Sequence, residues 1–393
     1  ALLNNRGLQA AYNELAIAEA RAVESSLPPN PAISLSRIAG SVEVEVERKI
    51  VANVPALATL PMRSQIAADR FRQAQIIALS ETLRIAAETR RAYYRAVAAR
   101  ELAGFLAQAQ SGAATAAKFA TRLGETGGMN KLDQAREQVF YADLTAQLAS
   151  TRQRAASERE TLIRAMGLWG DDLGFKMAAA LPPLPSRPRA LPDIESEAVR
   201  RHVDLRIGRL ELDALAKSYG LTQATRFINV LDAGLSAKTT REKATGEKIR
   251  DRGFDVELQI PIFDFGEVRV REAEATYMHA VNRLTERAVN VRSEARDAYR
   301  SYRSAYDITM HYQKEVLPLR KIISDETLLR YNGMLIDVFA LLAEARQRIA
   351  ATTAAIEAKR DFWLAATNLS TAVMGGGVAA RSETTLASGA SNQ

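Results

Sequence analysis

The chain is an internal duplication, because residues of its first half return in its second half in the same order. The segment ETRRAYYRA, which begins at Glu88, returns 206 residues later as EARDAYRSY from Glu294. LDQAREQ, from Leu132, returns as LAEARQR from Leu342, at an offset of 210 residues. An alternating apolar and polar stretch precedes each copy. Such a repeat constrains the fold, because both halves must form the same arrangement of elements.

Each copy reads as a helix, two strands, a very long helix, a tight turn and another long helix. Prolines of LPPNP (Leu27–Pro31) end the first helix, since proline removes a backbone donor and forces extended geometry before it. Strict alternation predicts the strands, and glycine-rich stretches divide the long helices. In the first copy we expect helices at 1–25, 62–122 and 130–166, and strands at 32–38 and 41–50. In the second copy we expect helices at 194–219, 267–330 and 334–373, strands at 225–235 and 253–263, and a polar loop between the strands.

The sequence therefore predicts an α+β, mainly α, internally duplicated chain. The first repeat covers 1–167, a Pro-rich linker covers 168–191, and the second repeat covers 192–374. A Gly/Ser-rich, flexible C-terminal tail, 375–393, follows. Because the helical pattern already runs at Ala1 without a cap, we expect that the N-terminus is trimmed from a longer chain.

Composition excludes several classes of protein. There are no cysteines, which removes disulfides, thiolate metal sites and a cysteine nucleophile. The net charge is +7, but the basic residues interleave with acidic ones along the helices, so nucleic-acid binding is not favoured. No apolar run reaches the length of about 18 residues that a transmembrane helix needs. The three histidines are scattered and no catalytic or metal motif is present, so we expect no enzyme activity, no cofactor and no metal site.

The strands carry a possible membrane signal. In FDVELQIPIF, Phe254, Val256 and Leu258 fall on one face and Asp255 and Glu257 on the other. This alternation suits a spanning β-strand, although a soluble amphipathic sheet shows it too. Four strands cannot close a barrel, and an open sheet edge is not tolerated in lipid. If the strands lie in a membrane, several chains must share one barrel.

The order and spacing of these segments resemble the TolC-type outer-membrane efflux channels. The marks are LPPNP before the first strand pair, IPIFDFGEVR (Ile260–Arg269) after the second, and RYNG (Arg330–Gly333) followed by LLAEAR (Leu341–Arg346). Together they cover about 1–374. The first copy departs from the pattern, with IVANVPALATLPMR in place of IPIFDFG and with Leu123 and Gly124 in place of the tip tyrosine.

The resemblance implies a homotrimer in the outer membrane of a Gram-negative bacterium, with four strands per chain in one twelve-stranded barrel and a helical barrel in the periplasm. It also implies acidic residues that close the tunnel near the tip turns. Glu344, Asp337 and Asp133 are the candidates for this periplasmic gate, and the alternative is that they are ordinary solvated helix acids. Three symmetry-related carboxylates would repel one another or hold a cation.

The barrel interior and the tips supply the other expected sites. Acids expected to line the barrel lumen are Glu43, Glu45, Glu47, Asp255 and Glu257. Residues expected to shape the tip turns, where an adaptor would dock, are Gly124, Gly128, Tyr331 and Gly333. The expected partners are a periplasmic adaptor (membrane fusion) protein, an inner-membrane pump and outer-membrane lipid, with no nucleic acid.

The function expected is a passive conduit of a tripartite efflux system or a type I secretion system, for small molecules or metal ions. The alternative is a soluble periplasmic coiled-coil adaptor or structural protein. Which substrate is exported, and by which pump, the sequence leaves open.

Overall fold

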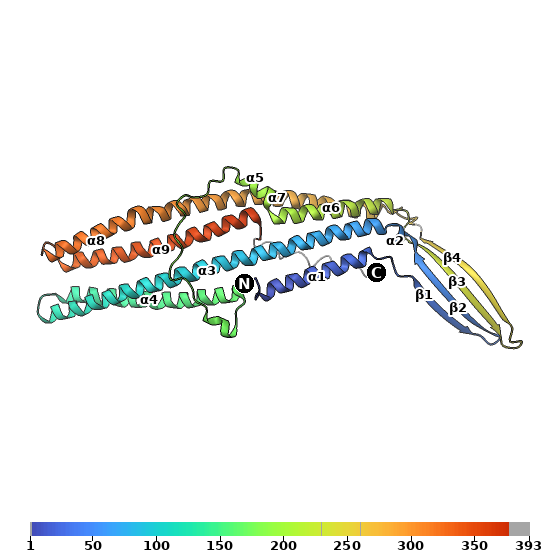
Figure 1. Cartoon of the computed structure of the whole chain (residues 1–393), viewed down its shortest axis with the longest axis horizontal. Coiled ribbons are helices and arrows are strands. Elements are labelled where there is room, and N and C mark those ends of the chain that lie inside the picture. Colours follow the sequence, from blue (N-terminus) through green and yellow to red (C-terminus); the bar gives the residue numbers. More distant parts are fainter. Residues whose placement is uncertain (1, 229, 260, 377–393) are drawn as a thin grey trace. The chain divides into compact units, whose positions relative to one another are not determined.

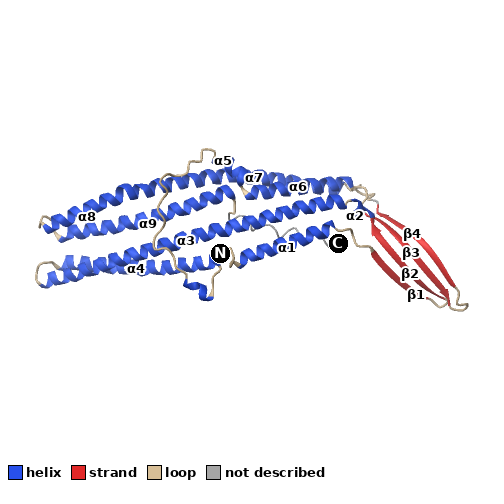
Figure 2. Cartoon of the chain, in the orientation of Figure 1, coloured by secondary structure: helices blue, strands red, loops and turns tan. Residues whose placement is uncertain are grey.

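A computed structural model of the chain describes residues 2–228, 230–259 and 261–376 (Figures 1 and 2). The first copy contains α1 (Arg6–Ser26), β1 (Ala32–Ala39), β2 (Glu43–Asn53), α2 (Val54–Ala58), α3 (Leu60–Glu125) and α4 (Lys131–Met166). After a 3-10 turn, η1 (Gly170–Gly174), the second copy contains α5 (Ile194–Arg201), α6 (Val203–Ala224), β3 (Val230–Glu242), β4 (Lys248–Gln259), α7 (Glu267–His311), the π-helical η2 (Tyr312–Val316), α8 (Leu317–Asn332) and α9 (Val338–Met374). The predicted α+β, mainly helical duplication is confirmed. Of the tail 375–393, the part after Gly376 lies outside the described residues.

The described part of the chain divides into two compact units, and each takes segments from both copies of the repeat. The first unit combines residues 2–9, 80–202 and 290–376. The second combines Ala10–Leu79 with Val203–Val289. The first unit is helical, and the second holds the sheet together with α1, α2, α6 and parts of α3 and α7. The two copies are therefore folded into each other rather than set side by side as separate domains.

The second unit contains one antiparallel four-stranded sheet in the order β1-β2-β3-β4. The central pairing joins the two copies, with Glu43 opposite Glu242 at one end and Asn53 opposite Asp232 at the other. At the helix end, the Asn53 amide Nδ2 donates to Asp232 Oδ1 over 3.1 Å. Asn53 also caps α2 by accepting from the Ala56 N–H. The unusual segment after β2 is thus a short helix with Pro55 in its first turn.

The predicted boundaries of the second strand pair were wrong. The polar segment expected to be a loop is instead most of a hairpin, whose turn contains only 243–247. Its charged residues can extend the strands because alternate residues point to opposite faces of a sheet. At the other end, the predicted strand at 253–263 stops at Gln259. Phe265 and Gly266 have φ of 48° and 74°, a left-handed geometry that leads into α7; Ile260 lies outside the described residues.

Two predicted helices are also interrupted. The helix expected at 194–219 is α5 and α6, separated at His202, whose ψ of 119° is extended. No glycine or proline marks this site, and it coincides with the boundary between the two units, which lies between His202 and Val203. The helix expected at 267–330 widens into the π-helical η2 just before Pro318. Proline cannot donate to the preceding turn, and a π-helical turn is a common response.

The core of the first unit lies where α3, α4 and α9 meet. One cluster consists of Leu102, Leu106, Ala113, Leu144, Leu148 and Ile356. The Pro-rich linker lies against this unit through specific bonds. Trp363 Nε1 donates to the Pro182 carbonyl over 3.1 Å, the Leu181 N–H donates to Glu101 over 2.8 Å, and Tyr306 donates to the Ser186 carbonyl over 3.1 Å. The linker therefore ties α3, α7 and α9 together.

Candidate functional site

The two helical hairpins of the first unit have the same tip geometry. After α3, the Gly128 N–H donates to the Leu123 carbonyl over 2.7 Å, and Gly127 is left-handed with φ of 77°. After α8, the Leu335 N–H donates to the Arg330 carbonyl over 2.9 Å, and Met334 is left-handed with φ of 58°. Both are Schellman endings, in which the residue after the cap adopts left-handed geometry. Equivalent residues of the two tips, such as Gly127 and Met334, are therefore 207 residues apart.

This alignment corrects the roles expected for the tip residues. Gly333 was expected to turn the chain through positive φ, but its φ is −80° and Met334 takes the left-handed position. Tyr331 is half-buried in the last turn of α8, and its carbonyl accepts from Met334. In the first tip, Gly128 follows the left-handed Gly127 rather than occupying that position. An adaptor docking role for these residues is not tested by their geometry.

Gly124 is in close contact with the next helix. A Cβ at this position would lie 1.8 Å from the side chain of Gln134, which donates in turn to the Met129 carbonyl over 3.0 Å. Gly124 therefore allows α3 and α4 to approach at their turn.

Two of the three predicted gate carboxylates lie at the N-termini of helices. Asp337 is the N-cap of α9, exposed, and its Oδ1 accepts from the Ala340 N–H over 2.9 Å. Asp133 lies three residues after Asn130, the N-cap of α4; it receives a 2.5 Å bond from the Asn130 amide, and its own N–H donates to Asn130 Oδ1. The Asn130 side chain thus accepts from the Asp133 N–H and donates to the Asp133 carboxylate, which fixes the first turn of α4. Local structure therefore accounts for both residues.

Glu344, the third gate candidate, is in a different environment. Its side chain is only 10% exposed, and Oε2 lies 3.2 Å from Nη1 of Arg320 on α8. The other oxygen, Oε1, is buried without a hydrogen-bond partner among the described residues. Arg320 also donates to Gln347 over 3.3 Å. Glu344 thus connects the two helices of its own hairpin.

The structure identifies Glu137, which the sequence reasoning missed, as the counterpart of Glu344. Each lies seven residues after the N-cap of its helix, Asn130 or Asp337. Glu137 is 3% exposed, Oε1 lies 3.0 Å from Nη2 of Arg346 on α9, and Oε2 has no partner among the described residues. The repeat offset of 210 had paired LDQAR with LAEAR and placed Asp133 beside Glu344. Counting from the caps at an offset of 207 would have found Glu137.

The Glu137–Arg346 pair joins α4 to α9, that is, one copy of the repeat to the other. The guanidinium of Arg346 also lies 4.5 Å from the ring centre of Phe140, a favourable cation–π distance. Burial raises the pKa of Glu137 above its ordinary value of 4.5, although Arg346 acts in the opposite direction and Asp133 adds to the rise. Burial therefore makes the ionised form of the Glu137 carboxyl less favourable than it would be in water.

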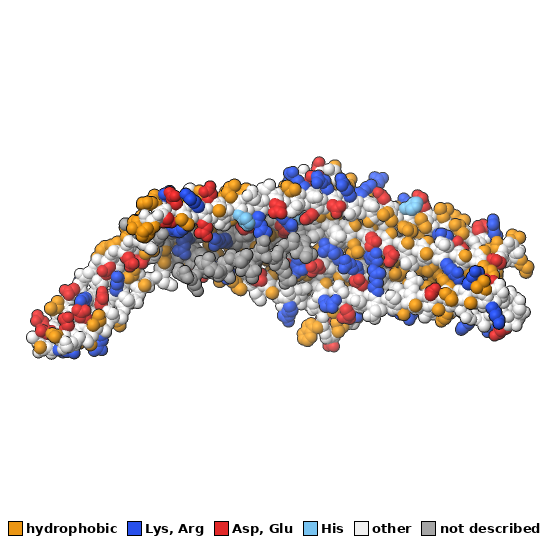
Figure 3. Space-filling model, turned by 180° about the vertical axis from the view of Figure 1, so that it is seen from behind, with side chains coloured by type: hydrophobic (Ala, Val, Ile, Leu, Met, Phe, Trp, Pro, Cys, Tyr) orange, Lys and Arg blue, Asp and Glu red, His pale blue; other side chains and the backbone are white. Residues whose placement is uncertain are grey.

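The five predicted lumen acids lie on one face of the sheet. The strand registers place Glu43, Glu45 and Glu47 of β2 on the same face as Asp255 and Glu257 of β4. Asp232, Glu242 and Asp251 share this face, so all eight acids of the four strands lie there (Figure 3). Lys49 lies 3.7 Å from Asp255 and Lys238 lies 2.8 Å from Glu45, the two basic residues on this face. The common face of the five predicted acids followed from alternation, but the presence of Asp232, Glu242 and Asp251 on it did not.

The opposite face of the sheet carries large exposed apolar residues. These are Ile33, Leu35, Ile50, Leu235, Phe254, Val256 and Leu258, whose exposed fractions run from 47% to 76%. Near the helix end, Phe227, Phe263 and Phe265 are also exposed. Exposed apolar surface of this extent marks an interaction with lipid or another protein. The sheet is thus acidic on one side and apolar on the other.

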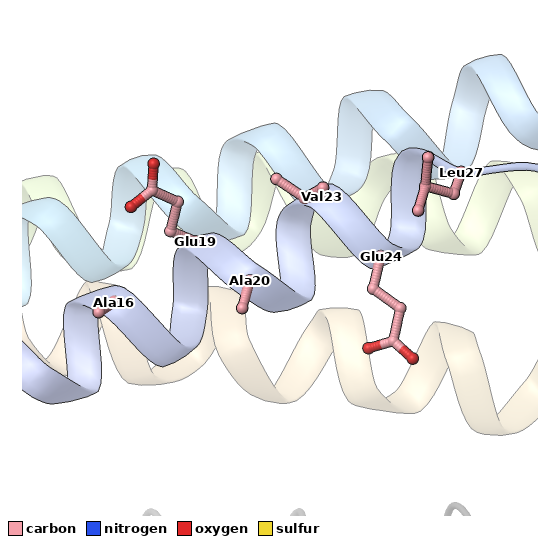
Figure 4. Close-up of a pocket in the computed structure, with 6 residues that line it drawn as sticks. All are labelled: Ala16, Glu19, Ala20, Val23, Glu24 and Leu27. Carbon is pink, nitrogen blue, oxygen red and sulfur yellow. The ribbon is translucent and has the colours of Figure 1, made fainter.

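A surface trough lies along α1 in the second unit. Its lining residues are Ala16, Glu19, Ala20, Val23 and Glu24, on one stripe of this helix, and Leu27 just after its end (Figure 4). Because a single helix lines it, the trough is an unpartnered helix face rather than a ligand pocket.

In the part of the chain that the structure describes, no group of three or more His, Cys, Asp or Glu residues could hold a metal ion. Among the same residues, no helix combines the length and the apolar character needed to cross a membrane.

Comparison with known proteins places these features in a class. Residues 195–323 match the family model described as outer membrane efflux protein. CusC is 16% identical, with a TM-score of 0.78 over 96% of this chain and 90% of that one. The outer membrane channel CmeC of Campylobacter jejuni is 14% identical, with a TM-score of 0.78 over 95% and 84%. The outer membrane protein VceC of Vibrio cholerae is 15% identical, with a TM-score of 0.75 over 95% and 94%. No curated protein matches the sequence.

The predicted resemblance to the TolC-type outer-membrane efflux channels is confirmed. The family model matches the second copy from α5 into α8. The shared fold extends over nearly the whole chain. The predicted outer-membrane location agrees with the description of the family and with the neighbouring structures.

Proposed function

We propose that the chain is one subunit of a trimeric outer-membrane channel of a Gram-negative bacterium, with its helices on the periplasmic side. The observation that carries this proposal is the sheet with one acidic and one apolar exposed face. In a barrel, the apolar face would meet lipid and the acidic face would line a water-filled lumen. Glu43, Glu45, Glu47, Asp255 and Glu257 would then give the pore a preference for cations.

The need for more than one chain follows from the sheet edges. In the described sheet, β1 and β4 each have a strand neighbour on one side only. Unpaired backbone groups are not tolerated in lipid, so β4 of one chain would pair with β1 of the next. Three chains would supply twelve strands. The exposed apolar residues of α1, such as Ile17 and Val23 at 52% and 55%, would become helix contacts in the same assembly.

The proposed channel is a passive conduit for export. It would serve a tripartite efflux system, or else a type I secretion system, and it performs no chemistry of its own. A periplasmic adaptor would dock at the hairpin tips around Gly124, Gly128, Tyr331 and Gly333. An inner-membrane pump would supply the energy and choose the substrate, whether a small molecule or a metal ion.

The gate is proposed to depend on carboxylates of the first unit. The side chains of Glu344 and Glu137 are 10% and 3% exposed and are paired with arginines of neighbouring helices. A rearrangement of these helices would therefore have to break these ion pairs. Asp337 is exposed and free to meet its symmetry mates, while Asp133 acts by fixing the start of α4. Opening would loosen α4 and α8 from α9.

Two measurements test the proposal. We expect the full-length protein to fractionate with outer membranes as an SDS-resistant trimer, and to conduct ions in planar bilayers. A soluble periplasmic adaptor, the rival function, would partition away from membranes and give no conductance. A stable monomer that needs no detergent would rule out the channel.

A further inference from the structure

The apolar face of the sheet is basic at its far end. The strand registers place six basic side chains, and no acidic one, on this face: Arg37, Arg48, Arg241, Lys248, Arg250 and Arg252. Every one of the six is exposed. They occupy the half of the strands nearer the two hairpin turns, where Leu35 and Val46 lie among them, while most of the large apolar residues occupy the half nearer the helices.

The change from apolar to basic takes place between two adjacent rows across the sheet. The last apolar row is Ile33, Ile50, Leu235 and Phe254. The next row outward holds Leu35, Arg48, Ala237 and Arg252, and the one after it Arg37, Val46, Thr239 and Arg250. Successive rows on one face are about 7 Å apart. The first two basic rows therefore lie within about 14 Å of the last apolar one.

No group within the described residues neutralises this charge. None of the six forms an ion pair there, whereas Lys49 and Lys238 on the opposite face both do. Arg241 lies directly opposite Lys248 in the β3–β4 ladder, and like charges in such a position are destabilising. A cluster of exposed basic side chains without acidic neighbours attracts anions.

Topology gives this cluster a place relative to a membrane. All the helices of the second unit join the sheet at one end, and the basic residues lie at the other. If the helices are periplasmic, which rests on the proposed function, the basic end faces the cell exterior. With the apolar rows in hydrocarbon, Arg48 and Arg252 begin at the depth of the headgroups, which extend about 5 to 8 Å beyond the hydrocarbon on each side.

We propose that the six basic residues bind the phosphate groups of lipid headgroups in the outer leaflet of the membrane. Arginine suits this ligand because its planar guanidinium donates two parallel hydrogen bonds to phosphate oxygens. Five of the six are arginines, and they lie on a face where their aliphatic stems continue the apolar surface. Such contacts would fix the depth of the barrel in the membrane.

The test uses the purified full-length protein in micelles of a neutral detergent, with no zwitterionic detergent present. Binding is measured to micelles doped with diphosphorylated lipid A, to micelles doped with phosphatidylcholine, and to inorganic phosphate alone. The variant carries Arg48→Gln and Arg252→Gln. The control carries Lys49→Gln and Lys238→Gln, which remove the same charge from the other face of the same sheet.

The wild type should bind lipid A more tightly than phosphatidylcholine or inorganic phosphate, and salt should weaken the binding. Affinity for lipid A should fall by about fivefold for each arginine removed, and the control should bind as the wild type does. Equal affinity in variant and wild type, or an equal loss in the control, would overturn the inference. Tight binding of inorganic phosphate alone would also overturn it in favour of a soluble anion.

Membrane fractionation separates this inference from the proposed function. If the wild type forms an outer-membrane trimer while its arginine variant binds lipid A unchanged, only the lipid site is wrong. If the wild type does not reach the outer membrane, the proposed function is wrong and the lipid site loses its basis.

Discussion

Glu137 and Glu344 occupy the same position in the two copies of the repeat, each seven residues after a helix N-cap. Their side chains are 3% and 10% exposed, each keeps one carboxylate oxygen without a partner among the described residues, and each pairs with one arginine. The partners differ, however. Arg320 holds Glu344 within one hairpin, whereas Arg346 ties Glu137 across the two copies. The duplication has thus preserved the position of the acid while the bond that it makes has changed.

The raised pKa of Glu137 predicts a particular pH dependence of stability. For a carboxyl whose folded pKa exceeds its unfolded value, stability is greatest when the group is protonated and falls as pH rises through the folded pKa. We expect Glu137→Gln to remove this loss. Thermal unfolding of both proteins should show the stability of the variant rising relative to that of the wild type as the pH increases above 4.5, the ordinary pKa of glutamate. A difference that stays constant with pH would contradict the assignment.

Conductance tests the gate residues. Glu344→Gln should weaken the bond to Arg320, loosen α8 from α9 and raise the open fraction in planar bilayers. Asp337→Ala should also raise conductance and weaken block by divalent cations, at a cost of about 1 kcal/mol for the lost cap. A matched control is Asp337→Asn, which keeps the cap and removes the charge. Should the double variant Glu344→Gln, Asp337→Ala conduct and block as the wild type does, the gate assignment fails.

The apolar face of β4 should not tolerate charge. Leu258→Arg is expected to destabilise the assembled barrel by about 2 to 4 kcal/mol if the residue lies near the middle of the bilayer. Glu257→Gln, the adjacent residue on the acidic face, should leave assembly nearly unchanged. The yield of SDS-resistant trimer and its melting temperature measure both effects. Equal tolerance of the two substitutions would argue against a lipid-facing strand.

The two tip turns offer a paired test of backbone geometry. Met334 adopts φ of 58°, which disfavours a side chain, whereas Gly127 adopts φ of 77° at the equivalent position. We expect Met334→Gly to stabilise the α8–α9 turn and Gly127→Ala to destabilise the α3–α4 turn, each by about 1 kcal/mol. Chemical unfolding of the two variants measures the changes. Loss of stability in both would mean that the Met334 side chain makes contacts that outweigh its strain.

Local chemistry accounts for what the sequence by itself determined. The repeat, the long helices, the proline stop before β1 and the alternation in β2 and β4 are all short-range signals. They sufficed for the mainly helical duplication with four strands, and for the common face of Glu45, Asp255 and Glu257. The same signals failed at the polar hairpin of β3 and β4. A run of charged residues predicts a loop, but alternation also allows such residues to extend a strand.

Tertiary structure decided the rest. The break at His202 has no glycine or proline to mark it in the sequence, and it lies at the boundary between the two compact units. The equivalence of Glu137 with Glu344 became visible only when the N-caps Asn130 and Asp337 fixed the register, because the letters of the repeat align better at a different offset. Partners such as Arg346 come from the other copy, more than 200 residues away, and only the folded chain brings such residues within bonding distance. The six basic residues likewise share one face because the strand registers place them there.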